Sequence, residues 1–186
     1  MGDSIIDKFY EDNDLLVKVL VEKGEISLWN NVDSQFRKTL VLYVASYFES
    51  MLKDIIIGFA RNQSRVKSPL VEFIKNKAVA RQYHTYFDWE SRNANSFFGL
   101  FGNDFKVFIT KVINSDSKFD NSIKAFLELG QLRNQLVHNN FAIFPLDKTT
   151  DEIYGLYKDA KLFLEIFSNK LNEYVKGLDI EITGAN

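Results

Sequence analysis

The stretch DSQFRKTLVLYVASYFESMLKDIIIGFARN, residues 33–62, decides the fold class of this chain. Its apolar residues recur at steps of three and four, which places them along one face of a helix. The series comprises Phe36, Leu40, Tyr43, Val44, Tyr47, Phe48, Met51, Leu52, Ile55, Ile56 and Phe59. Glu49, Lys53 and Asp54 interrupt the apolar run, so it is not a membrane span. We therefore expect a long amphipathic helix from about Asp33 to Asn62.

Further helices are expected on both sides of this stretch. Only two prolines occur in 186 residues, which favours long helices. Ser4 with Asp7, and Thr149 with Glu152, are candidate capping pairs at helix starts. The expected segments are Ser4 to Gly24, Leu70 to about Tyr83 after the Ser68-Pro69 cap, Asn95 to Phe101, Asp104 to Asn114, Asp120 to about Asn139, and Thr149 to about Lys176.

These segments predict an all-α protein, a single-domain antiparallel helical bundle with an extra N-terminal helix. The expected organisation is an N-terminal helix over 1–24, the bundle over 25–176 and a C-terminal tail over 177–186. The tail is expected to be frayed, or to pair as a short strand, because residues 179–183 alternate between polar and apolar. A chain of this length is large enough to fold around one core.

Composition excludes several classes of site. The chain has no cysteine, so disulfides and cysteine-based zinc sites are impossible. With only two histidines besides, we expect no metal and no cofactor. The net charge of −2 does not suit a protein that holds long nucleic acid by bulk electrostatics. The acidic N-terminus is unlike a signal peptide, and we expect a cytoplasmic protein without membrane contact. We expect most of the 17 Phe and 8 Tyr residues to lie in the core and some of them to line a subunit interface.

The stretch LGQLRNQLVHNNF, residues 129–141, combines a cation, an amide and an imidazole. Cleavage of RNA without a metal needs a base for the 2′-hydroxyl, an acid for the leaving 5′-oxygen and a cation for the phosphorane. His138 can serve as base or acid near neutral pH. Arg133 offers a planar fork of donors that matches phosphate oxygens. The motif therefore points to phosphodiester chemistry.

The spacing within the motif leaves its geometry open. On a straight helix Arg133 and His138 lie about 140° apart, whereas Asn134 and His138 are only about 40° apart. Either Arg133 reaches around with its long stem, or the helix loosens, or a second copy of the motif completes the site across a two-fold axis. We favour the composite site, because two copies of His138 would supply both a base and an acid. Alternatively, Arg133 pairs with a surface acid and His138 is a helix-end residue.

The motif resembles the signature of the HEPN superfamily, in which Arg is followed by four to six residues and then His, usually with a polar residue such as Asn134 directly after the Arg. Residues 44–54 look like an early helix of that family, residues 93–102 resemble the middle segment of its RiboL-PSP type, and the helix after Thr149 fits its closing helix. The resemblance implies a bundle that dimerises with both motifs in one cleft. It also implies catalytic roles for Arg133 and His138, with Asn134 assisting. Asn140 stands where many toxin members carry Tyr, so control through that tyrosine is not expected.

We accordingly expect a metal-independent endoribonuclease that leaves 2′,3′-cyclic phosphate ends and acts on RNA as a homodimer. The resemblance implies a toxin–antitoxin or phage-defence role, with an antitoxin or defence protein as a possible partner. The alternative is a HEPN module that binds RNA, a nucleotide or a protein without cutting.

Other residues have two interpretations each. Glu49 lies on an apolar helix and either holds Arg133 or Asn134 in place, or pairs with Lys53 four residues on. His84 is expected to be a surface or loop residue whose aromatic neighbours could stack on bases. Basic side chains that contact RNA, or that are simply solvated, are Arg61, Arg65, Lys67, Arg81 and Arg92.

Overall fold

The computed structural model describes residues 4–64 and 68–184, with side chains as far as 178. Within these ranges the chain is helical and contains no strand, which confirms the predicted all-α class. The α-helices are α1 (Ile5–Glu22), α2 (Ile26–Gln63), α3 (Pro69–Phe73), α4 (Asn95–Gly99), α5 (Asn103–Ser115), α6 (Ser117–His138) and α7 (Thr150–Gly184). A π-helix, η1 (Ile74–Val79), continues α3, and a 3-10 turn, η2 (Tyr83–Thr85), follows it.

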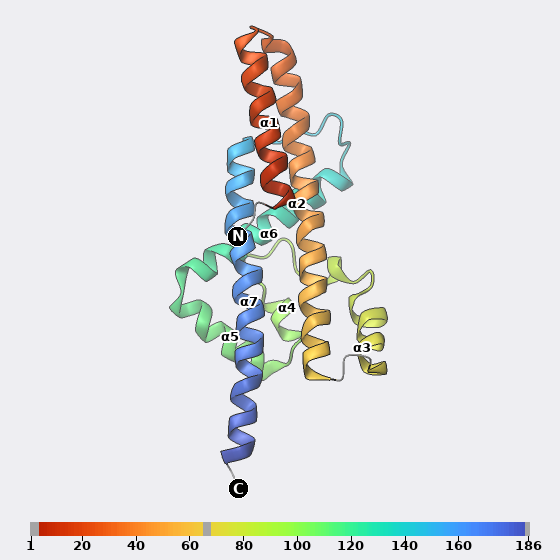
Figure 1. Cartoon of the computed structure of the whole chain (residues 1–186), viewed down its shortest axis with the longest axis vertical. Coiled ribbons are helices and arrows are strands. Elements are labelled where there is room, and N and C mark those ends of the chain that lie inside the picture. The colour runs from red at the N-terminus through yellow and green to blue at the C-terminus, as the bar shows by residue number, and fades with distance from the viewer. Residues whose placement is uncertain (1–3, 65–67, 185–186) are drawn as a thin grey trace.

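Three long helices set the shape of the molecule. α1 and α2 form an antiparallel hairpin, and α7 runs beside α2 in the same direction (Figure 1). The hairpin turn is at Gly24, whose φ of +72° is accessible to glycine at little cost. α6 runs obliquely to α2 and α7 and packs against both, most extensively against α7 (Figure 1). The motif lies at the carboxyl end of this crossing helix.

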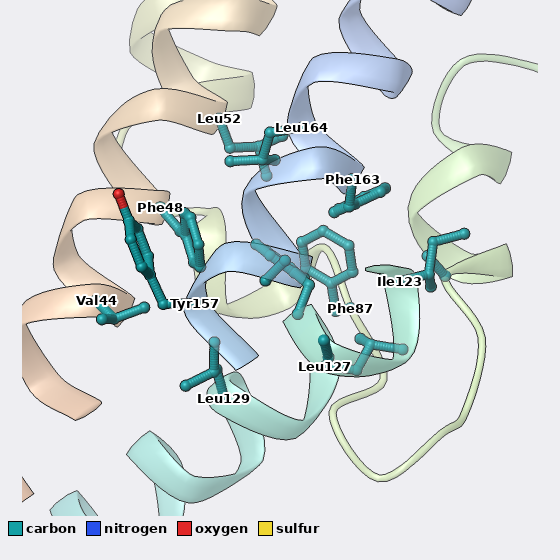
Figure 2. Packing of buried hydrophobic residues seen from close by; sticks show 14 of the residues in the cluster. Val44, Phe48, Leu52, Phe87, Ile123, Leu127, Leu129, Tyr157, Phe163 and Leu164 are labelled. Carbon is teal, nitrogen blue, oxygen red and sulfur yellow. The ribbon is translucent and has the colours of Figure 1, made fainter. Parts of the chain in front are cut away.

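Aromatic rings join the helices in the core. Phe48 of α2 lies 5.7 Å, between ring centroids, from Phe126 of α6, which in turn lies 4.9 Å from Phe163 of α7. Figure 2 shows buried side chains of α2, α6 and α7, among them Phe48, Leu127 and Phe163, meeting in this core. Phe97 and Phe98 of α4 are also fully buried. Core packing therefore accounts for much of the aromatic content.

Polar contacts fix α1 against α7. The predicted capping pair of Ser4 and Asp7 is confirmed, and the Asp7 carboxylate also accepts from Tyr154 at 2.9 Å. Burial raises the pKa of Asp7, but the hydrogen bonds from Ser4 and Tyr154 outweigh it, so the net pKa lies below the ordinary value. Tyr10 donates to Asp151 at 2.6 Å, and this bond, with burial and the nearby negative charge, raises the pKa of Tyr10 to about 12. α1 is thus joined to the bundle by polar contacts at the surface as well as by Ile6 in the core.

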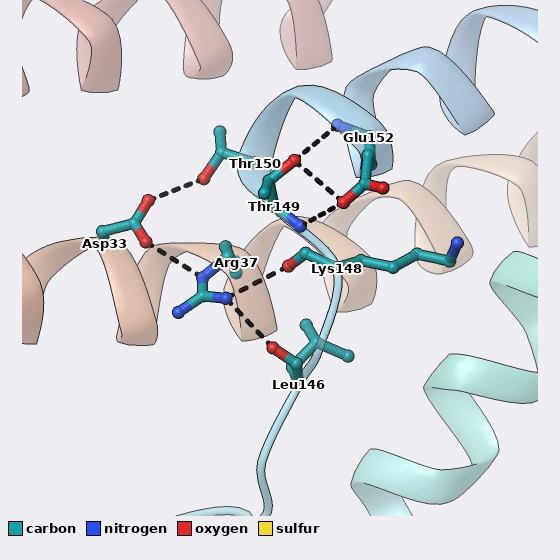
Figure 3. Close-up of polar contacts among 7 residues, drawn as sticks. All are labelled: Asp33, Arg37, Leu146, Lys148, Thr149, Thr150 and Glu152. Atoms are coloured by element: carbon teal, nitrogen blue, oxygen red, sulfur yellow. Dashed lines mark hydrogen bonds and ion pairs between the residues drawn. The ribbon is translucent and has the colours of Figure 1, made fainter.

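Two neighbouring basic residues of α2 hold the loop that follows α6. Arg37 forms an ion pair with Asp33 at 3.0 Å and donates to the Leu146 carbonyl at 3.0 Å, as Figure 3 shows. Lys38 is almost fully buried and donates to the Phe141 carbonyl at 2.8 Å. Buried cations of this kind need such partners. The chain after the motif is therefore held on α2.

Three helix bounds differ from the prediction by four residues or more. α2 begins at Ile26, seven residues before Asp33. Its first turns lack a buried apolar face, since Ile26 and Leu28 are half exposed, and the apolar spacing therefore did not reveal them. The third helix ends at Val79, because Ala80 is extended and Arg81 has a φ of +61°. α7 continues to Gly184 instead of ending near Lys176, so residues 179–183 are helical and do not form the short strand considered for them.

Across residues 4–64 and 68–184, no helix is both long enough and apolar enough to cross a bilayer.

Candidate functional site

The motif residues line one pocket at the carboxyl end of α6. Gly130, Arg133, Asn134 and His138 all contribute to its wall. Taking Gly130 as reference, ideal helix geometry puts Arg133 about 60° to one side and His138 about 80° to the other, with Asn134 between them. The pocket therefore spans the broad face that separates the two residues. Arg133 and His138 of a single chain share this concavity despite their angular offset.

The opposite walls come from α2 and from the loop after η1. α2 contributes Ala45 and Glu49, and the loop contributes Arg81, Tyr83, His84 and Trp89. The pocket has a volume of about 400 Å³, within the range of sites for small ligands. It contains two arginines, two histidines and one carboxylate. Its polar groups suit an anionic ligand.

Arg133 is oriented by its neighbour in the sequence. Its Nη1 donates to Oδ1 of Asn134 at 3.1 Å, and both side chains are partly buried. Among the described residues Arg133 forms no ion pair with a carboxylate. The guanidinium therefore keeps donors for a ligand. His138, the last residue of α6, is exposed.

Glu49 pairs with Lys53 one turn along α2. This is the simpler of its two predicted interpretations, and within the described part of the chain Glu49 has no hydrogen bond to Arg133 or Asn134. The negative charge of Glu49 nevertheless affects the pKa of Tyr83, which lines the same pocket. Burial raises the pKa of Tyr83, the charge of Glu49 raises it further, and Arg133 opposes them. Tyr83 therefore stays a neutral phenol between these opposite charges.

A tight contact joins the loop to α6. A Cβ built on Gly130 would lie 2.0 Å from Cζ3 of Trp89 and 2.1 Å from its Cε3, so the indole occupies the space that a side chain would need. Trp89 Nε1 donates to the backbone carbonyl of His84 at 3.0 Å. The glycine thus lets the loop approach the motif helix closely.

Comparison with known proteins gives one match. Residues 7–173 match the family described as RiboL-PSP-HEPN, which is most of the chain. The chain belongs to this family. The match includes most of α1, which the sequence prediction set apart as an addition to the HEPN bundle. No curated protein and no solved structure matches the chain. HEPN domains are associated with RNA and are often nucleases, although some do not catalyse.

The predicted basic residues of this HEPN domain separate into groups. Arg81 lines the pocket with the motif, whereas Arg61 is exposed near the end of α2 and does not. Arg92 lines a second hollow on the other side of Trp89. Arg65 and Lys67 lie outside the described residues. Arg81 is therefore the one of these whose position supports ligand contact at the motif.

His84 was not predicted as part of the HEPN site, yet it lines the same pocket as His138. The sequence contained a signal, since Gly130 inside a helix indicates close packing by another element. The sequence pattern could not show, however, that Trp89 is the residue that packs against Gly130. Over the described ranges, no cluster of three or more His, Cys, Asp or Glu side chains has the arrangement of a metal site.

Proposed function

We propose that this HEPN protein is a metal-independent endoribonuclease acting at the pocket beside Arg133 and His138. The observation that carries the proposal is that Arg133, Asn134 and His138 converge on one pocket in a chain of this family. The pocket has unpaired guanidinium donors and an exposed imidazole, the groups that transphosphorylation of RNA requires.

Each residue has a distinct task in the proposed reaction. Arg133 binds the non-bridging phosphate oxygens and stabilises the charge of the phosphorane. Asn134 holds Arg133 through their hydrogen bond, and its amide NH₂ is left to donate to the substrate. His138 transfers a proton, either from the 2′-hydroxyl or to the 5′-oxygen. The products are a 2′,3′-cyclic phosphate and a 5′-hydroxyl.

The charge distribution limits how RNA is held. With a net charge of −2, affinity has to come from local cations such as Arg81 and Arg133. We propose that the protein acts as a homodimer in which two pockets face one cleft, as HEPN domains commonly dimerise. Such a cleft would give single-stranded RNA a longer path than one pocket offers.

A cleavage assay tests the proposal. Purified protein is incubated with a mixed-sequence RNA in excess EDTA, alongside the variants Arg133→Ala, His138→Ala and Gln135→Ala. The last is a matched control, because Gln135 is exposed on α6 and does not line the pocket. Cleavage by wild type and Gln135→Ala, with at least a 100-fold loss in the other two, is the expected result. RNA binding without cleavage in wild type would favour the non-catalytic alternative.

The cellular role is proposed on the same basis. An active endoribonuclease of the toxin or phage-defence kind should slow growth when expressed, and His138→Ala should relieve that effect. Equal growth inhibition by wild type and His138→Ala would contradict this role. Relief by a protein encoded beside it would identify an antitoxin.

A further inference from the structure

The pocket contains a second imidazole from the same chain. His84 and His138 are the two histidines of the sequence, and both line the pocket with Arg133. Both side chains are exposed, so each can exchange a proton with a bound molecule. His138 is on α6, whereas His84 is in η2 on the facing loop. A substrate phosphate bound by Arg133 would thus have imidazoles on two different walls.

The loop that carries His84 is held in place. Trp89 Nε1 donates to the His84 carbonyl at 3.0 Å, and the Trp89 ring lies directly against Gly130 of α6. Tyr83, next to His84, packs its ring 5.6 Å from that of Trp89 and is partly buried. These contacts tie the backbone of His84 to the helix that bears the motif. A fixed backbone lowers the cost of positioning an imidazole for proton transfer.

The backbone conformation of Arg81 is a further feature of the loop that carries His84. Its φ of +61° is a left-handed conformation that a residue with a side chain rarely adopts. This conformation ends η1 and turns the chain back towards α6 three residues before His84. Both Arg81 and His84 line the pocket as a result. Strain of this kind is retained where the surrounding contacts determine the loop.

We propose that His84 is the second proton-transfer group of the reaction, so that one chain carries both the acid and the base. The inference rests on the proposed endoribonuclease function. One imidazole, neutral, takes the proton from the 2′-hydroxyl while the 2′-oxygen attacks phosphorus. The bond from phosphorus to the 5′-oxygen breaks, and the leaving oxygen takes a proton from the other imidazole, which starts the reaction protonated. No water, metal or redox partner is consumed, and the two imidazoles return to their starting states through solvent.

The test separates proton donation from structural support. A short RNA spanning a cut mapped with wild-type protein is prepared in two forms, one normal and one with sulfur in place of the scissile 5′-oxygen. A thiolate leaves without being protonated, so loss of the general acid slows only the normal RNA. The variants are His84→Gln, His138→Gln and Glu90→Gln. The last is a control, since Glu90 is an exposed residue of the same loop that does not line the pocket.

We expect His84→Gln and His138→Gln each to lower cleavage of the normal RNA at least 100-fold, with Glu90→Gln within about threefold of wild type. We also expect one of the two histidine variants, and only one, to recover near wild-type rates on the sulfur-containing RNA. Thermal unfolding of each variant confirms that it is folded.

Other outcomes overturn the proposal. If His84→Gln cuts the normal RNA within threefold of wild type, the second group is elsewhere, for example His138 of a second copy. If neither histidine variant is rescued by sulfur, the imidazoles do not divide acid and base between them. Both results leave the proposed nuclease function intact, whereas wild-type protein that cuts neither RNA removes the nuclease function and this inference together.

Discussion

Replacing Gly130 with Ala tests how the loop is held against the motif helix. The new Cβ would lie 2.0 Å from Cζ3 of Trp89, whereas carbon atoms in contact are normally about 3.5–4.0 Å apart. The indole must therefore retreat by about 1.5 Å. Overpacking of this kind lowers the stability of the fold by about 1–3 kcal/mol, whereas alanine in a helix interior raises it by about 1 kcal/mol relative to glycine. We expect a net destabilisation of about 0–2 kcal/mol.

The matched control is Gly155→Ala in α7, where a Cβ would meet nothing within 4 Å. This variant gains the helix preference without the clash, so its free energy of unfolding should rise by up to about 1 kcal/mol. Urea denaturation gives the free energy of unfolding of both variants, and the difference between the two values, about 1–3 kcal/mol, is the cost of the clash. Fluorescence of Trp89 in a Trp29→Phe background should shift to the red in Gly130→Ala, because the displaced indole becomes more solvated. If Gly130→Ala is as stabilising as Gly155→Ala and the emission is unchanged, the close approach is not present in solution.

Three further predictions concern other contacts. Lys38→Met removes the donor that holds the loop after α6, so urea denaturation should show a loss of about 1–3 kcal/mol; no loss would mean that the loop does not depend on it. Tyr10 has a folded pKa of about 12 against about 10 when unfolded, so its bond to Asp151 contributes stability that is present below pH 10 and lost as the pH rises towards 12. Stability measured across pH 10–12 should therefore fall less steeply in Tyr10→Phe, and equal slopes would argue against the bond. Thr149→Ala removes the cap shared with Glu152 and should cost about 1 kcal/mol, whereas an unchanged unfolding midpoint would show that the cap contributes nothing.

The helices were predictable because their signals are local. The three-and-four spacing in α2 identified residues that are buried in the structure, such as Phe36, Leu40 and Phe48. Capping pairs marked the starts of α1 and α7 correctly. By contrast, the burial of Lys38 could not be foreseen, because its partners are backbone carbonyls more than 100 residues away. A periodic pattern identifies a face but not what covers it.

The α6 wall of the candidate site was predicted as a unit, whereas Glu49 and Arg81 of the facing walls were named only singly and His84 was not assigned to the site. Arg133, Asn134 and His138 are close in the sequence, so a motif could identify them together. Arg81 and His84 reach the same pocket through the turn after η1, which depends on tertiary packing against Gly130. Helix geometry left three arrangements open, of which we favoured a site completed by a second chain. The facing loop offers a second histidine within the same chain.

The ends of the RNA products test the central proposal most directly. RNA cut by the purified protein in excess EDTA is examined for its terminal groups, with His138→Ala as the negative control. We predict 2′,3′-cyclic phosphate and 5′-hydroxyl ends, formed at the same rate with and without chelator and absent in the variant. Products with 3′-hydroxyl and 5′-phosphate ends, or cleavage that continues in His138→Ala, would contradict the assignment of the pocket as the nuclease site.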